Sequence, residues 1–164
     1  MGMESYFITL NIENLNSSDY IAQLFKQYCD VSRYKMPSGK LFKRHIIDDS
    51  RFVIDNKAVV AVAVNQDAAD ITFELCFSNY ESNLSYIYDV TKWLASFGKA
   101  SYIKVLNTEY DFGNLGYEEF RAIVFKSFLS KYRLFLRHYG EINQDILPCN
   151  FYACIRRRGI NREE

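Results

Sequence analysis

The sequence predicts an α+β fold, in which a single domain holds a mixed, mainly antiparallel sheet packed by about three helices. Segments whose apolar residues alternate with polar ones are interleaved with segments whose apolar residues recur at helical spacing. The length of 164 residues, with 49% hydrophobic and 24% charged, is typical of one globular domain. We expect this domain to span residues 1–158 and a short charged tail to follow at 159–164.

The beginning of the chain predicts a strand, a helix and a loop. The alternation from Tyr6 to Ile12 predicts a strand. Ser17 and Ser18 are suitable N-caps for a helix that the apolar spacing predicts over residues 18–29. Residues 30–40 contain the turn sequence Pro-Ser-Gly and predict a loop.

A meander of strands is the clearest part of the predicted sheet. A short strand at 41–47 precedes a turn at Asp48-Asp49-Ser50, and Asp55-Asn56 predicts a tight hairpin. The run Ala-Val-Val-Ala-Val-Ala-Val has no polar residue, so we expect it to be central and buried on both faces. The predicted meander covers residues 51–77, with strands at 51–54, 58–64 and 71–77.

The second half of the chain predicts two more helices. Helical spacing reappears before Gly98 and again before Gly140, and we expect both glycines to end helices. The longer helix is apolar on more than one face, which predicts that it crosses the core or is covered by a partner. The expected elements are a helix at 81–97, a strand at 101–106, a loop at 110–116, a helix at 117–139 and a strand at 151–156.

Charge and cysteine content narrow the class of function. Lys+Arg and Asp+Glu both number 20, so the formal net charge is zero. This balance disfavours nucleic-acid binding and makes association with another protein or a second copy of the chain easier. No apolar run has the length of a membrane span, and the first residues lack a secretory signal. The four cysteines lack zinc or redox spacing, so we expect reduced thiols in a cytoplasmic protein.

Glu74 is the one candidate for a catalytic group. It lies in the middle of a predicted strand, flanked by Phe73 and Leu75. If its face of the sheet is covered, its pKa should rise, which would suit a general base. An exposed strand carboxylate is the commoner explanation of the same pattern.

The other titratable residues suggest structural roles. His45 and His138 are the two imidazoles, and no carboxylate partner for either can be identified from the sequence. Asp48, Asp49 and Asp55 could suggest a divalent metal, but turn chemistry explains them without one. We therefore expect no metal and no cofactor.

Two basic clusters are candidate anion sites. Either could hold phosphate or an acidic partner, and Tyr34 or Phe42 could add stacking for a nucleic acid. Glu163 and Glu164 follow the second cluster, so a solvated end is its simpler explanation. The clusters are Arg33, Lys35, Lys40, Lys43 and Arg44, and then Arg156 and Arg158.

Tyrosine is abundant, with 13 residues in the chain. Tyrosines at the edge of a core or on a contact surface find partners for their hydroxyl groups, so the surplus fits either location. Biased base composition in the source genome would give the same surplus. The candidate partner-binding residues are Tyr80, Tyr86, Tyr88, Tyr110 and Tyr117.

The order of the predicted elements resembles that of the acetyl-CoA-dependent N-acyltransferase superfamily. The meander at 51–77, the helix at 81–97 and the strand at 101–106 can be laid onto that order. In that family a basic, glycine-containing loop before the helix holds the cofactor pyrophosphate. Here the corresponding loop, Ser78 to Asn83, has no glycine and no Arg or Lys, so no functional residue is carried over.

Taken alone, the sequence favours a small binding protein without catalysis. A protein partner is expected, in an inhibitor, immunity or adaptor role, because plentiful Tyr and mixed charge occur without a recognisable catalytic set. One alternative is an acyltransferase-like enzyme, or a degenerate relative, that uses an acyl-CoA or nucleotide cofactor. A second alternative is nucleic-acid binding through the local basic clusters.

Overall fold

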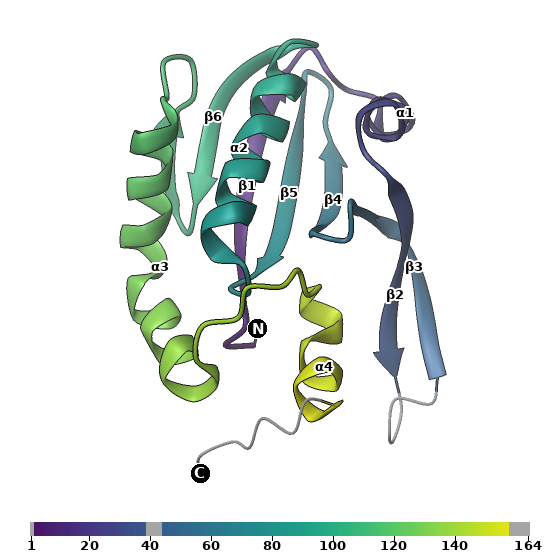
Figure 1. Ribbon diagram of the computed structural model, residues 1–164. Coiled ribbons are helices and arrows are strands. Elements are labelled where there is room, and N and C mark those ends of the chain that lie inside the picture. The colour runs from purple at the N-terminus through teal and green to yellow at the C-terminus, as the bar shows by residue number, and fades with distance from the viewer. Residues whose placement is uncertain (1, 39–43, 158–164) are drawn as a thin grey trace.

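Seven strands form one sheet at the centre of the molecule, in the order β2-β3-β4-β5-β1-β6-β7. The structure is a computed structural model that describes residues 2–38 and 44–157 (Figure 1). The strands are β1 (Ser5–Glu13), β2 (Val31–Ser38), β3 (Arg44–Ile54), β4 (Ala58–Val64), β5 (Ala68–Cys76), β6 (Lys99–Val105) and β7 (Thr108–Asp111). The helices are α1 (Ser18–Tyr28), α2 (Tyr80–Ala95), α3 (Tyr117–Tyr139) and α4 (Phe151–Arg157), with a 3-10 turn, η2 (Pro148–Asn150). The predicted α+β class is confirmed.

The first strand lies inside the sheet rather than at its edge. β1 pairs antiparallel with β5 from Ser5 opposite Cys76 to Glu13 opposite Ala68, and antiparallel with β6 on its other side. The connection from β5 through α2 to β6 therefore crosses over β1. The predicted meander is confirmed as β3-β4-β5, with Asp55 and Asn56 in left-handed conformation at its first turn.

One face of the sheet carries the main core. Figure 1 shows α2 and α3 running along this face. Alternate residues of β1 point into it, and Tyr6, Ile8, Leu10 and Ile12 are all fully buried. No helix within the described residues has both the length and the apolar character needed to cross a bilayer.

The opposite face is polar along β1 and β5. Thr9 and Thr72 share a hydrogen bond of 2.9 Å between their hydroxyls, and Asn11 Nδ2 donates to Asp70 Oδ1 at 2.8 Å. These cross-strand pairs stabilise the sheet without apolar cover. The segment after α3 closes another part of this face, where Leu147 and Cys149 pack against a small cluster of Tyr34, Val53 and Val59.

Both edge strands carry features that prevent pairing with other chains. The register of β2 shifts between Arg33 and Lys35, and Pro37 follows without a backbone donor. At the other edge, β7 is only four residues long and exposes Glu109 and Asp111. Bulges, proline, charges and short length are the usual protection of a sheet edge.

Two predictions near β2 are wrong. Residues 31–38, within the predicted loop, form β2, and the expected turn at Asp48-Asp49-Ser50 lies inside the strand β3. For β2 the reason is its edge position, because an edge strand tolerates proline and charged residues that otherwise signal a loop.

Three further expectations are corrected. The predicted loop at 110–116 begins inside β7, and the expected final strand at 151–156 is the helix α4, which follows Pro148 at the start of η2. The strand 58–64 is central, but only its first half is buried, and Val64 is 43% exposed. The longest helix matches the prediction, and Gly140 at φ 70° ends it.

Gly98 does not cap α2, whose C-cap is Ser96. A Cβ at Gly98 would lie 2.5 Å from Ile12 Cγ2 and 2.7 Å from Glu13 O, so the residue is small because β1 passes against it. We predict that Gly98→Ala lowers the free energy of unfolding by about 1–3 kcal/mol through overpacking. Gly116→Ala is the matched control, since nothing lies within 4 Å of a Cβ there. Urea unfolding measures both, and equal stability of the two variants would contradict the prediction.

Candidate functional site

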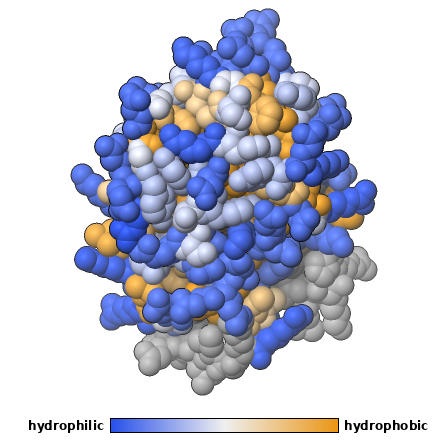
Figure 2. Space-filling model, turned by 45° about the horizontal axis from the view of Figure 1, so that its top comes forward, coloured by the Kyte–Doolittle hydropathy of each residue, from blue (hydrophilic) through white to orange (hydrophobic). Residues whose placement is uncertain are grey.

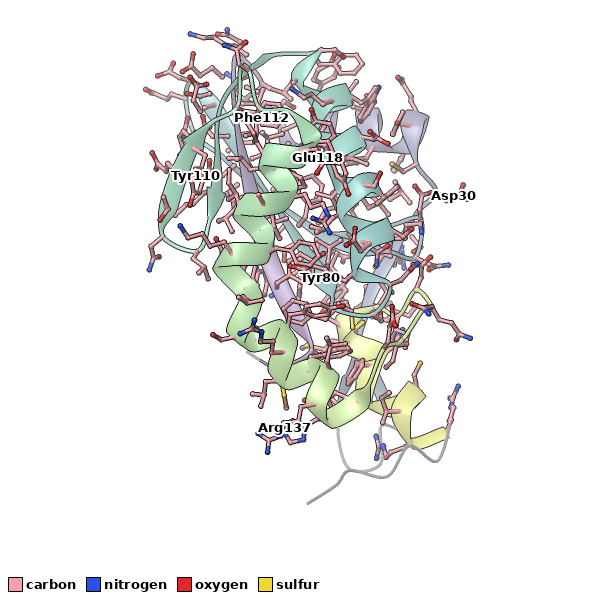
Figure 3. All side chains as sticks on the ribbon, turned by 60° about the vertical axis from the view of Figure 1, so that its left-hand side comes forward. Asp30, Tyr80, Tyr110, Phe112, Glu118 and Arg137 are labelled. Atoms are coloured by element: carbon pink, nitrogen blue, oxygen red, sulfur yellow. The ribbon has the colours of Figure 1, made fainter. Side chains whose placement is uncertain are left out.

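The five predicted tyrosines do not form one surface. Tyr80 is 3% exposed and packs in the core, and Figure 3 shows it between α2 and α3, whereas Tyr110 lies at the sheet edge on β7. Tyr88 donates a hydrogen bond to Leu115 O at 2.9 Å, and its ring lies 5.4 Å from that of Tyr117. These contacts hold half-buried rings between α2 and α3.

Tyr86 belongs to a different neighbourhood, at the C-terminal end of α1. Its hydroxyl donates to Asp55 Oδ2 at 2.6 Å and lies 3.7 Å from Cys29 Sγ. Burial, followed by the hydrogen bond to Asp55, raises the pKa of Tyr86, so the phenol stays protonated. Burial is also the main cause that raises the pKa of Cys29 to about 11. A protonated, buried thiol is a weak nucleophile, so this group is structural.

A surface of three aromatic residues lies where α1 meets α2. Tyr28 stacks on Trp93 with ring centroids 4.3 Å apart and planes at 13°, and Phe97 contacts Trp93 edge-on at 5.2 Å. Tyr28 is 48% exposed and Phe97 is 40% exposed. We call Tyr28, Trp93 and Phe97 the aromatic ridge. Tyr86 lies on the same side of α2 as Trp93, two helical turns closer to the N-terminus.

The members of the aromatic ridge touch one another, since both Tyr28 and Phe97 contact the ring of Trp93. Figure 2 shows that, on the face it presents, apolar residues occur in small groups among hydrophilic ones. The inner ring of the ridge, Trp93, also contacts the fully buried Phe25, with centroids 6.1 Å apart. The ridge is therefore held rigidly on the core while two of its rings face solvent.

Glu74 lies on the polar face of β5, opposite Phe7 on one side and Val59 on the other. It is half-buried, and burial raises its pKa, although the positive charge of Arg51 opposes the shift. The shift is in the direction that a covered face predicts. Within residues 2–38 and 44–157, no hydrogen bond joins the Glu74 side chain to a catalytic partner.

The predicted basic clusters are only partly described. Arg33 and Lys35 are exposed on β2, and Arg44 belongs to β3, while Lys40, Lys43 and Arg158 lie outside the described residues. Arg156 is exposed at the end of α4, far along the chain from β2. Three cavities adjoin β2 among the described residues. One of about 260 Å³ is lined by Lys26, Arg33 and Arg51 among others, one of about 210 Å³ by Arg33 and Lys35 among others, and the third by Asp30, Ser32 and Asp55 among others.

The N-terminus of α2 is covered by the segment that follows α3. The backbone N–H of Asn79 donates to Ile142 O at 2.6 Å, and its side chain donates to Asp145 Oδ1 at 2.8 Å. Lys57 Nζ also contacts Asp145, at 2.7 Å. Burial opposes ionisation of Asp145, but these two donors outweigh it and its pKa is lowered. Backbone atoms and a carboxylate of this segment thus cover the first residues of α2.

The remaining candidates are dispersed. His45 is in β3, and His138 is half-buried in the last turn of α3. Asp49 is in β3 and Asp55 in the following turn, and within the described part of the chain no three His, Cys, Asp or Glu residues are grouped to hold a metal ion. All four cysteines are free thiols.

Sequence reasoning missed the aromatic ridge and Lys26. Tyr28 was visible only as one apolar residue of the first helix, and Trp93 and Phe97 as members of the second. The sequence does contain a signal for this surface, because α1 and α2 each place an aromatic residue, Tyr28 and Trp93, at the margin of the apolar side of the helix. The pairing of the two helices, however, follows from the tertiary fold.

Comparisons with known proteins add no assignment: no family model, no curated protein and no solved structure matches the chain.

The raised pKa of Glu74 has a consequence for stability. Because its folded pKa exceeds the unfolded value, the folded state disfavours the carboxylate, and Glu74 reduces stability as pH rises through that interval. We predict that Glu74→Gln raises the Tm at neutral pH and that this gain disappears in acid, where both states are protonated. Glu109→Gln, at an exposed strand position, is the control. Parallel Tm–pH curves for wild type and Glu74→Gln would contradict the prediction.

Proposed function

We propose that this chain is a protein-binding module whose contact surface is centred on the aromatic ridge. The observation that carries the proposal is the stack of Tyr28 on Trp93, in which Tyr28 remains 48% exposed. Tyr and Trp are the residues most often found at the energetic centre of protein interfaces. Rings that are already ordered lose little conformational entropy when a partner binds.

The chemistry of the aromatic ridge favours an apolar anchor on the partner. Lys or Arg groups lie over six other rings, including Tyr34, Tyr86 and Tyr88, but over none of the ridge rings in the described residues. Gln27 and Ser96, next to Tyr28 and Phe97 in the sequence, are exposed, and so is Asp89, which lies one turn before Trp93 on α2. An apolar centre inside a polar rim is the usual anatomy of a contact surface.

The occupant that we propose is a different protein, in an inhibitor, immunity or adaptor complex. The proposal includes a cytoplasmic location, because the four cysteines are free thiols and a reducing compartment keeps them so. A second copy of the chain is the competing occupant, since zero net charge provides no self-repulsion.

The test compares two variants as baits in an extract of the cells that express the protein. Tyr28→Ser/Phe97→Ser removes both exposed rings of the aromatic ridge. Tyr20→Ser is the matched control, because Tyr20 is on the same helix and is 46% exposed but stacks on no ring in the described residues. We expect one protein to be captured stoichiometrically by wild type and by Tyr20→Ser, and lost from the double variant.

The captured protein is then purified and titrated against the same three proteins by calorimetry. The double variant should bind it about thirtyfold more weakly or worse, which corresponds to loss of a hot-spot residue. The Tm of each variant verifies folding, because losing the two ring pairs Tyr28–Trp93 and Trp93–Phe97 costs only about 1–3 kcal/mol. Equal affinity of the double variant, capture of no stoichiometric partner, or a wild-type dimer dissociated by the double substitution would each overturn the proposal.

A further inference from the structure

Positive charge lines the surface between α1 and the edge strand β2. The larger of two adjoining cavities, of about 260 Å³, is lined by Lys26 from α1, Arg33 from β2 and Arg51 from β3. The second, of about 210 Å³, shares Ser32 and Arg33 with the first, but it is lined by Val53, Leu147 and Cys149 and so opens on the opposite face of the sheet. We call the larger cavity, with Lys26 and Arg33 at its wall, the basic groove.

Opposite charge in the basic groove is sparse. Asp49, exposed on β3, is the one carboxylate among the described residues that line either cavity. A third cavity beyond Ser32 has Asp30 and Asp55, but Asp55 already accepts hydrogen bonds from the Tyr86 hydroxyl and the Asp30 N–H. The carboxylates therefore gather at one end of β2, and the cations occupy the rest.

Most cations of the basic groove are not neutralised within the protein. Lys26 and Arg33 form no ion pair with any residue in the described ranges. Arg51 does have a contact, since its guanidinium lies 5.4 Å from the centre of the Tyr34 ring, which belongs to the small cluster on the opposite face. Two cations without ion pairs at the wall of one cavity can both contact a multiply charged anion.

The floor of the basic groove strengthens these charges. Phe52 lines the larger cavity and packs edge-on against the fully buried Phe25, with centroids 5.2 Å apart. An apolar wall lowers the local dielectric on one side of the cations, and a charge–charge interaction beside it exceeds one in bulk water. The cavity of about 260 Å³ is several times the ~30 Å³ that a water molecule occupies in the liquid, so a phosphate group fits.

We propose that the basic groove binds a small ligand that carries phosphate groups, through Lys26 and Arg33. Arg and Lys are the side chains that bind phosphate most effectively, Arg through paired N–H donors. A small ligand is favoured over a nucleic acid because the chain as a whole has no net positive charge to track a long backbone.

This site is independent of the aromatic ridge. Lys26 and Tyr28 are two positions apart on α1, which directs their side chains about 160° apart around the helix axis. Lys26 faces the hairpin and Tyr28 faces Trp93 on α2. Failure of the protein-binding proposal would leave the phosphate site untouched, and the reverse also holds.

The experiment titrates wild-type protein with inorganic pyrophosphate at low ionic strength and follows two-dimensional NMR shifts. We expect saturable shifts confined to α1, β2 and β3, and about tenfold or greater loss of affinity in Arg33→Gln, since a hydrogen bond to a charged group is removed. Arg133→Gln, at an exposed position on α3, is the matched control and should bind as wild type does. Arg33 is exposed and unpaired, so Arg33→Gln should fold, which its spectrum verifies.

Succinate, titrated in parallel, separates phosphate recognition from general attraction of anions. Weaker binding of succinate supports a phosphate site, whereas equal affinity would overturn that assignment. Absence of saturable pyrophosphate binding at millimolar concentration, or equal weakening in Arg33→Gln and Arg133→Gln, would overturn the site itself.

Discussion

The insertion of β1 between β5 and β6 is the constraint on which the rest of the structure depends. It brings residues 5–13 between residues 68–76 and residues 99–105, so the centre of the sheet is built from three distant parts of the chain. Its inward side chains, from Tyr6 to Ile12, have no solvent exposure. The sheet therefore cannot close until loop-closure entropy over most of the chain has been overcome. One local consequence is that β1 passes so close to Gly98 that a Cβ placed there would lie 2.5 Å from Ile12 Cγ2.

The central position of β1 also dictates the path of α1. The chain leaves the middle of the sheet after β1 and re-enters at its far edge as β2, so α1 must bridge β5, β4 and β3 (Figure 1). One flank of this bridge packs against α2, where Tyr28 meets Trp93. The other flank faces the β2–β3 hairpin, where Lys26 lines the larger cavity. Both surfaces of functional interest are thus results of one connection.

Much of the fold could be predicted because its core elements have strong local patterns. Alternation identified β1 and the β3-β4-β5 meander, and Gly140 marked the end of α3. The sequence failed at β2 and β7 because edge strands use the proline, glycine and charges that also mark loops. It failed at α4 because seven residues contain too few turns for a helical period. The domain limits at 1–158 and the tail at 159–164 stay predictions, since residues 158–164 lie outside those described.

The candidate sites were harder to predict, for a different reason. Tyr80 and Tyr88 are both on α2, but the Tyr80 ring is buried in the core and the Tyr88 hydroxyl donates a hydrogen bond to Leu115 O. The position of each residue around the helix decides which neighbours its ring contacts. The basic residues around Arg33 were recognised from their spacing, but Lys26 joined them only through the approach of α1. Glu74 shows the intermediate case, since its raised pKa follows from cover supplied by the fold.

Zero net charge hides how unevenly the charges are used. Several carboxylates are already engaged within the protein, Glu81 with Arg121, Asp145 with Lys57 and Glu13 with Lys99. Asp70 is occupied by Asn11, and Asp55 by Tyr86. These carboxylates already hold strands and helices together. Lys26 on α1 and Arg33 and Lys35 on β2 therefore have no ion-pair partner among the described residues. A neutral sequence can therefore carry a local positive surface, and it does so where α1 bridges the sheet to its edge.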